Sequence, residues 1–267
     1  METVEAKETW KSKIFLINRK GDNHAKMISK IAPKFPILIW MGFMIVALAF
    51  VIGYFNSQTA AAYFSESKVV RETTLLAERA SIESTNLWLP YLKFLGHGMV
   101  LGGIVMALRV ILDNLMQAGG KVLANLPADK RPAVPTAPWY GRLMPVVMML
   151  GMLIFIFALI ISLQLASTAR AVFANPLPVI DAAGAGTALL AQVQTIHATS
   201  AWLVPFKFFG IATEFLAILM GLATIAYVLK AQTEMLKKGV QAARTRMKQP
   251  KPVKQQEKAP VAETVAA

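Results

Sequence analysis

The chain has 267 residues, of which 55% are apolar and 16% charged, with 28 lysines and arginines against 15 acidic residues. This composition, with a mean hydropathy of +0.50, excludes an ordinary soluble domain and is typical of a membrane protein. Because the sequence contains no cysteine, it also excludes disulfides, thiolate metal sites and cysteine nucleophiles.

The first predicted element is a membrane span that follows the polar and basic residues 1–35. No charged residue occurs over the 19 positions from Ile37 to Phe55, which is enough helix to cross a hydrocarbon core about 30 Å thick. The run starts too late and is too long for the apolar region of a secretion signal. We therefore expect it to remain in the mature protein.

Three further apolar stretches, 87–112, 143–165 and 201–229, are as long as the first. The third span, 143–165, has no charged residue over 23 positions. The segments before the second and fourth spans, 67–86 and 182–200, are predicted to be helical and mildly amphipathic. The sequence thus predicts an all-α integral membrane protein with four transmembrane helices. The charged or titratable residues inside the second and fourth spans are Lys93, His97, Arg109, Lys207 and Glu214.

The sequence also contains an internal repeat. Residues 73–115 align without a gap on residues 187–229, with 16 of 43 positions identical. At an offset of 109, residues 41–65 align on residues 150–174. This self-similarity predicts a tandem duplication of one two-helix hairpin. Because each unit has two spans, the copies should insert in the same orientation, as a parallel repeat.

Basic residues are concentrated on one side of the predicted membrane. Residues 1–35 hold eight lysines and arginines against four acids, residues 109–142 hold five against two, and residues 230–267 hold nine against three. The connections 57–87 and 166–200 have no basic excess. Cytoplasmic segments carry such an excess, so both termini are predicted to be cytoplasmic, in a bacterial-type inner membrane or its equivalent.

These features divide the chain into five parts. Residues 1–35 form a basic cytoplasmic segment and 36–115 the first hairpin; 116–142 form a cytoplasmic linker and 143–230 the second hairpin. Residues 231–267, rich in proline, lysine, glutamine and alanine, are predicted to be a disordered basic tail. Since the basic residues flank the spans, we expect contact with anionic lipid headgroups and no nucleic-acid binding.

Two tryptophans and two lysines recur in both copies of the repeat. Trp88 and Trp202 are predicted to anchor the spans at the outer interface. Lys93 and Lys207 lie five residues further in, about 7–8 Å along a helix. Either each lysine extends back to the headgroups, or the two face each other across the pseudo-two-fold axis and form an anion-attracting vestibule.

Glu214 and His97 break the symmetry of the repeat. Glu214 lies about 18 Å inside the interface and His97 about 13–14 Å, and their counterparts are Val100 and Ile211. A carboxylate at that depth must be protonated, paired or hydrated. We predict an intramembrane polar site formed by His97, Glu214 and the two lysines, with a proton or cation as the functional reading. The structural alternative is a polar contact that fixes helix register.

Glycines in the second and fourth spans are predicted to permit close helix packing. Gly98 and Gly102 form a small-xxx-small pair, Gly103 begins another, and Gly210 lies in the fourth span. Such glycines also let a ligand approach a helix. The neighbouring His97 and Met99 are potential copper or haem ligands. His24 and His197 should lie on opposite sides of the membrane, so we predict no metal site and no cofactor.

No glycine-rich phosphate loop, zinc-protease helix or serine nucleophile elbow occurs in the sequence, and no catalytic residues are predicted. Two functions are therefore compared. The first is a non-catalytic membrane subunit or scaffold of a larger assembly, with other membrane subunits or further copies of itself as partners. The alternative is a small ion or solute transporter or channel that uses the intramembrane polar site.

Overall fold

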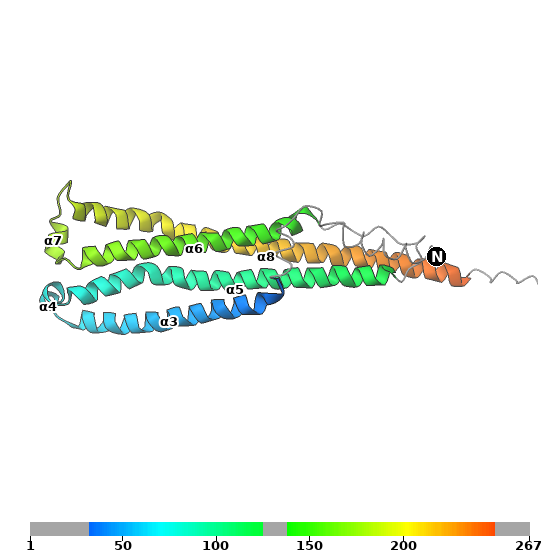
Figure 1. The fold of residues 1–267 in the computed structure, drawn as a ribbon, viewed down its shortest axis with the longest axis horizontal. Coiled ribbons are helices and arrows are strands. Elements are labelled where there is room, and N and C mark those ends of the chain that lie inside the picture. Colours follow the sequence, from blue (N-terminus) through cyan, green and yellow to red (C-terminus); the bar gives the residue numbers. More distant parts are fainter. Residues whose placement is uncertain (1–31, 125–137, 249–267) are drawn as a thin grey trace, which may run out of the picture.

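The structure, a computed structural model, describes residues 32–124 and 138–248. In these residues four long helices lie side by side as an elongated bundle (Figure 1). Two short helices close the connections at one end of the bundle (Figure 1). In chain order the elements are η1 (Ala32–Lys34), α3 (Phe35–Ser65), α4 (Lys68–Thr73), α5 (Leu76–Ala124), α6 (Trp139–Phe173), α7 (Leu177–Asp181) and α8 (Ala188–Lys248).

Each of the four long helices contains a stretch that is long and apolar enough to cross a membrane. These stretches lie in Ala32–Ser65, Leu76–Lys121, Trp139–Phe173 and Ala188–Gln241. The prediction of an all-helical chain with four possible membrane spans is confirmed. The helices indicate a multi-pass membrane protein, since a helix satisfies its own backbone hydrogen bonds in lipid.

Local sequence explains where the helices at the α4 and α7 end begin. The Ser67 side chain accepts a hydrogen bond from the Val70 amide and caps α4. The Thr187 hydroxyl accepts from the Leu190 amide in the first turn of α8. Before it, Gly186 has a φ of +86°, which side chains other than glycine rarely adopt.

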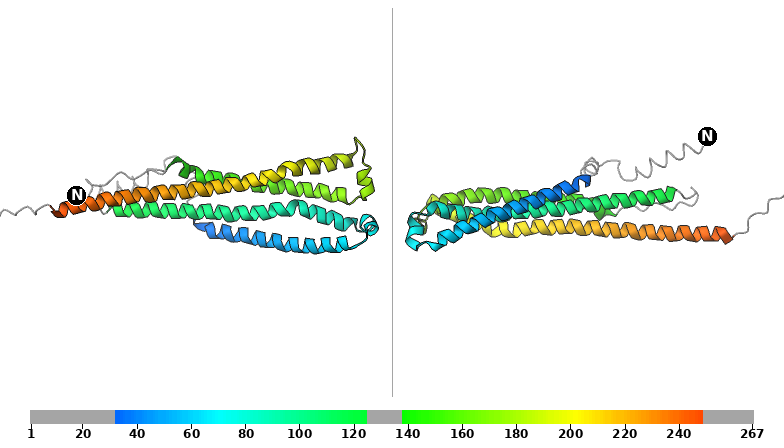
Figure 2. Two further views of the ribbon diagram at one scale, coloured as in Figure 1. Left: turned by 180° about the vertical axis from the view of Figure 1, so that it is seen from behind. Right: turned by 90° about the horizontal axis from the view of Figure 1, so that it is seen from below.

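Helix α5 lies at the centre of the bundle. It packs against α3, α6 and α8, and α6 packs in turn on α8. Figure 2 shows the α3 and α5 hairpin lying along the α6 and α8 hairpin. Buried apolar residues form three clusters along the bundle: Leu165, Ala169, Val172 and Ile196 nearest α7; then Tyr91, Ala158 and Leu203; then Val105, Met144, Met148 and Ala217.

Two helices continue past the start of α6 and form what we call the stalk, residues 112–124 of α5 and 224–248 of α8 (Figures 1 and 2). Gly141, in the first turn of α6, lies against Thr224 at the base of the stalk. Further along, the Gln232 side-chain amide donates a 2.7 Å hydrogen bond to the Leu115 carbonyl oxygen. The two helices therefore remain in contact beyond α6.

The stalk corrects two of the predicted boundaries. Residues 231–248, assigned to a disordered tail, are helical, and α5 extends into the predicted linker 116–142 as far as Ala124. The polar composition of the tail did not reveal that α5 runs beside the first part of it. The predictions for residues 1–31, 125–137 and 249–267 lie outside the described residues.

Candidate functional site

Glu214 is completely enclosed by the bundle. Its exposed fraction is 0%, and it lies where α8 meets α6. A methyl group added to Gly151 of α6 would be 2.8 Å from Glu214 Oε1 and 2.9 Å from its Cγ. Neither carboxyl oxygen has a hydrogen-bond partner among the described residues. The glycine makes room for the carboxyl group, but no described side chain satisfies it.

The other buried polar side chains of the described residues behave differently. Ser162, Thr213 and Thr224 are all buried, and each donates a hydrogen bond of 2.7–2.8 Å to a carbonyl three or four residues earlier in its own helix. A hydroxyl group can satisfy itself in this way. An ionised carboxyl group has only acceptors and cannot bond a helix carbonyl, so in that form Glu214 would need a donor from elsewhere.

Apolar layers close the bundle on both sides of Glu214. One turn before it on α8, Gly210 lies against the ring of Phe155, and Gly98 of α5 lies against the same ring. Phe155 itself is almost fully buried. The layer one turn after Glu214 consists of Val105, Met144, Met148 and Ala217. The carboxyl group therefore sits in a packed, apolar interior between three helices.

His97 does not reach Glu214. Its side chain is exposed, and Nδ1 lies 2.7 Å from the Lys93 carbonyl oxygen on the same helix. Because a carbonyl oxygen only accepts, Nδ1 carries the proton in this hydrogen bond. The contact between His97 and Glu214 that the sequence suggested is absent from this structure. Met99 is buried whereas His97 is exposed, so these two side chains do not converge as a ligand pair.

The two predicted lysines occupy different interfaces. The Lys93 Nζ lies beside α3, 3.6 Å from where a methyl group on Gly53 would be. The Lys207 Nζ lies 4.7 Å from the centroid of the Phe94 ring and 5.1 Å from that of Tyr91, both on α5. A third ring, on Phe208, is 5.5 Å away. The lysines therefore do not face each other, and Lys207 is held by aromatic faces.

All four predicted packing glycines are buried. Gly98 and Gly210 enclose Phe155 from two sides, and Gly103 lies against Ile39 of α3. Gly102 is less crowded, since a methyl group there would be 3.6 Å from the nearest side-chain atom, on Leu38. Close packing at three of these positions leaves no room for a ligand there.

The interface tryptophans also differ from each other. Trp88 on α5 is partly buried, while Trp202 on α8 is exposed. Trp202 stacks edge-to-face on Phe206, with ring centroids 5.6 Å apart. That both tryptophans anchor the spans at the membrane interface stays a prediction.

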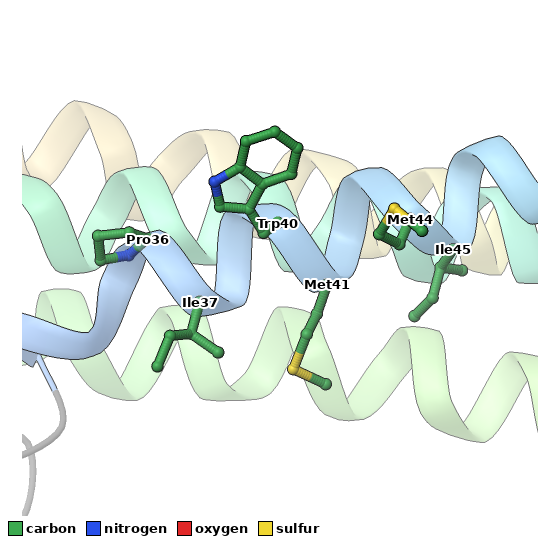
Figure 3. A pocket seen from close by; sticks show the side chains of 6 residues that line it. All are labelled: Pro36, Ile37, Trp40, Met41, Met44 and Ile45. Atoms are coloured by element: carbon green, nitrogen blue, oxygen red, sulfur yellow. The ribbon is translucent and has the colours of Figure 1, made fainter.

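A groove of about 510 Å³ runs along the outer side of α3 (Figure 3). The side chains that line it all come from α3, as Figure 3 shows, and none of them is an acid, a base or a nucleophile. Such a surface suits lipid chains or another apolar helix. The lining residues are Pro36, Ile37, Trp40, Met41, Met44 and Ile45.

A polar cavity that sequence reasoning missed lies at the α4 and α7 end of the bundle. It has a volume of about 220 Å³, and we call it the arginine pocket because Arg71 and Arg79 are its central groups. The charges of residues 57–87 were used only to predict orientation. The sequence feature that could have revealed the pocket is the pair of arginines on either side of the break between α4 and α5. The full lining is Tyr63, Phe64, Lys68, Arg71, Glu72, Arg79, Glu83 and Leu177.

No group of three or more histidine, aspartate or glutamate side chains in residues 32–124 and 138–248 is placed to hold a metal ion. No protein-family model, curated protein or solved structure matches the chain. Its function must therefore be argued from its own geometry.

Proposed function

We propose that the chain is a non-catalytic subunit or scaffold of a larger membrane assembly. The observation that carries the proposal is an apolar pair on the stalk. Leu236 and Val240 lie four residues apart on α8 and are 54% and 53% exposed. Lys230 and Lys237 on the same part of α8 favour an aqueous setting. Large apolar side chains on one face of a solvated helix are typical of a helix that docks into a partner.

The membrane-facing surface supports the same proposal. Helix α3 fully buries only Gly42, Ala49 and Tyr63, and its outer face exposes large apolar side chains such as Phe43 and Phe50. Helix α6 exposes a similar row, including Phe157. Lipid, another membrane subunit or a second copy of the chain can cover such faces without unpaired polar groups.

The test is gentle solubilisation of the native membrane with tagged protein, followed by sizing and identification of stoichiometric partners. We compare the wild type with a Leu236→Gln and Val240→Gln double variant. A matched control is Glu234→Gln, an exposed change on the same helix. A stoichiometric partner that the double variant loses and the control keeps supports the proposal. A wild-type chain that purifies alone as a monomer overturns it.

A second candidate, a small ion or solute transporter or channel, is favoured by one observation. Glu214 is a fully buried carboxyl group without a partner in the described bundle. Ionisable groups inside a membrane are costly and commonly mark ion or proton pathways. Against this candidate, Lys93, His97 and Lys207 lie at three other places, so the four predicted polar residues form no shared chamber in the described residues.

Flux through liposomes separates the two candidates. Glu214→Gln keeps the shape of the side chain and removes its capacity to ionise. If the chain transports, the variant loses flux while its oligomeric size stays the same. If Glu214 serves assembly, the variant alters the size or the partner content, and neither protein conducts.

We also infer that the α3 and α5 hairpin and the α6 and α8 hairpin are copies of one unit. Gly42 touches Val100, and Gly151 touches Glu214. Under the two offsets of the repeat, Gly151 is the counterpart of Gly42, and Glu214 is the counterpart of Val100. The contact of Gly96 with Val46 likewise corresponds to that of Gly210 with Phe155. Two matching contacts between equivalent residues support a common origin beyond shared composition.

The stalk end is proposed to lie in the cytoplasm of a bacterial-type inner membrane. On this side Lys34 directly precedes α3, Lys121 lies in the last turn of α5, Arg142 lies in the first turn of α6, and Lys230 lies in the stalk part of α8. These residues belong to the segments with a basic excess in the sequence. The positive-inside rule and attraction to anionic headgroups support this orientation.

A further inference from the structure

The arginine pocket contains two guanidinium groups with unused donors. Arg71 Nε and Arg79 Nη1 are both shielded from solvent and have no hydrogen-bond partner among the described residues. A buried donor left without an acceptor is destabilising, and guanidinium groups carry the donors that are hardest to leave unpaired. Both arginine side chains line the same cavity, where an anion would offer acceptors to their guanidinium groups.

The acids that line the cavity do not supply that acceptor in the structure. Glu72 pairs with Lys68 at 3.7 Å, one turn apart on α4. Neither Glu72 nor Glu83 forms an ion pair with Arg71 or Arg79 in the part of the chain that is described. The arginines are therefore not neutralised by their neighbours.

Aromatic rings hold the two guanidinium groups in position. The Arg71 guanidinium carbon lies 5.7 Å from the centroid of Tyr63 and 5.4 Å from that of Phe64, and Arg79 lies 5.1 Å from Phe173. The face of an aromatic ring attracts a guanidinium group and restrains its position. The donors are thus oriented before any ligand arrives.

Charge and size restrict the ligand. The lining holds three basic and two acidic side chains, a net charge of +1 that one anionic group would neutralise. A volume of about 220 Å³ has room for roughly seven water molecules. A single tetrahedral or planar oxyanion with a small substituent fits this space.

We propose that the arginine pocket binds a phosphate group, with the guanidinium groups of Arg71 and Arg79 donating to its oxygens. The planar donor edge of a guanidinium matches phosphate oxygens, and such charge-assisted bonds are the strong ones. The pocket is separate from Glu214 and from the stalk, so the inference does not depend on the proposed function.

Position in the bundle allows two sources for the phosphate. Tyr63 lies eight residues beyond Phe55, the last residue of the uninterrupted apolar run of α3, about 12 Å along a helix. The headgroup layer is about 5–8 Å thick on each side of the core, so the pocket lies on the water side of that layer. Both a phospholipid headgroup and a phosphate monoester dissolved in water reach this level.

Native mass spectrometry of delipidated full-length protein in detergent tests the site. The probes are phosphatidylglycerol, a diacylglycerol with the same chains but no phosphate, and glycerol phosphate. The wild type should retain one phosphatidylglycerol or one glycerol phosphate, and no diacylglycerol at the same concentration. Arg71→Gln and Arg79→Gln should each weaken binding about tenfold, the effect of losing one charge-assisted bond.

The matched control is Arg170→Gln, because Arg170 is an exposed arginine at the end of α6 and lines no part of the pocket. Binding of phosphatidylglycerol that glycerol phosphate does not displace identifies a lipid headgroup as the source. Binding of glycerol phosphate alone, or displacement by it, identifies a dissolved ester.

Arg71→Lys and Arg79→Lys keep the positive charge but lose the planar set of guanidinium donors. These variants replace the glutamine variants in the test if the latter fail to fold. They should fold with unchanged helicity and bind severalfold more weakly. The proposal is overturned if the wild type binds neither phosphate probe. It is equally overturned if binding survives unchanged in all four pocket variants, or if Arg170→Gln weakens binding as much as they do.

Discussion

At the residue scale, Glu214 is the position where the two hairpins differ most in chemistry. The proposed duplication makes Val100 its counterpart, and a valine side chain has no hydrogen-bonding group that needs a partner. Glu214→Val should therefore raise the free energy of unfolding by about 1 kcal/mol, since a buried polar group without a partner costs about 1–3 kcal/mol. Thermal unfolding in detergent measures the change, which corresponds to roughly 2–4 °C in Tm.

The control for this substitution is Thr224→Val on the same helix. Thr224 is equally buried, but its hydroxyl group is already bonded to the Met220 carbonyl. Removing it should leave the melting temperature nearly unchanged. A lower melting temperature for Glu214→Val would show that the glutamate side chain stabilises the folded protein, and would contradict the prediction.

Sequence reasoning located Glu214 but not its surroundings. Its spacing from Trp202 gave its depth, because a helix rises by a fixed amount per residue. Whether His97 turned toward it depended on a competing hydrogen bond to the Lys93 carbonyl, which no pattern reveals. The pairing of Lys207 with Tyr91 and Phe94 likewise depends on how α5 and α8 cross.

At the element scale, the contact between α3 and α5 depends on a glycine. A methyl group on Gly42 would lie 2.6 Å from the Gly96 carbonyl oxygen and 2.9 Å from the Val100 amide nitrogen. These are backbone atoms of α5, which cannot rotate away. Gly42→Ala should force the helices apart and lower the free energy of unfolding by about 1–3 kcal/mol, measured by thermal or denaturant unfolding.

Gly102→Ala provides the comparison on α5. The nearest side-chain atoms would be 3.6 Å away on Leu38 and 3.7 Å away on Met152, which are ordinary contacts. Alanine also favours a helix over glycine, by up to about 1 kcal/mol. Gly102→Ala should therefore be neutral or slightly stabilising. Equal destabilisation by both substitutions would contradict the close approach at Gly42.

The elements themselves were predictable to different degrees. The charge-free runs of α3 and α6 predicted spans because charged groups are costly in hydrocarbon. The helical continuation of α8 to Lys248 escaped prediction, since the polar composition after Lys230 resembles that of a disordered tail. Beyond the start of α6, α8 is held against α5 by the hydrogen bond from Gln232 to the Leu115 carbonyl oxygen. This bond joins segments that are far apart in the sequence. Composition cannot reveal such a contact.

At the scale of the whole molecule, the two ends of the bundle differ in chemistry. One end holds the stalk and the basic flanks of the spans. The other holds α4, α7 and the arginine pocket, and the connection 57–87 at this end has three basic residues against four acidic ones. An asymmetric bundle of this kind has a preferred orientation in a membrane, and the proposed phosphate site and docking face would lie on opposite sides.

Because the chain contains no cysteine, single substitutions report this orientation directly. Ala185→Cys places a thiol in the exposed turn before α8, and Lys238→Cys places one on an exposed position of the stalk. With a membrane-impermeant maleimide, spheroplasts should label Ala185→Cys at once and Lys238→Cys only after permeabilisation, because basic flanks stay in the cytoplasm. The reverse order would invert the topology and place the stalk outside the cell. Equal labelling of both in sealed spheroplasts would mean that the stalk and the α7 end lie on the same side, which four spans of this bundle do not permit.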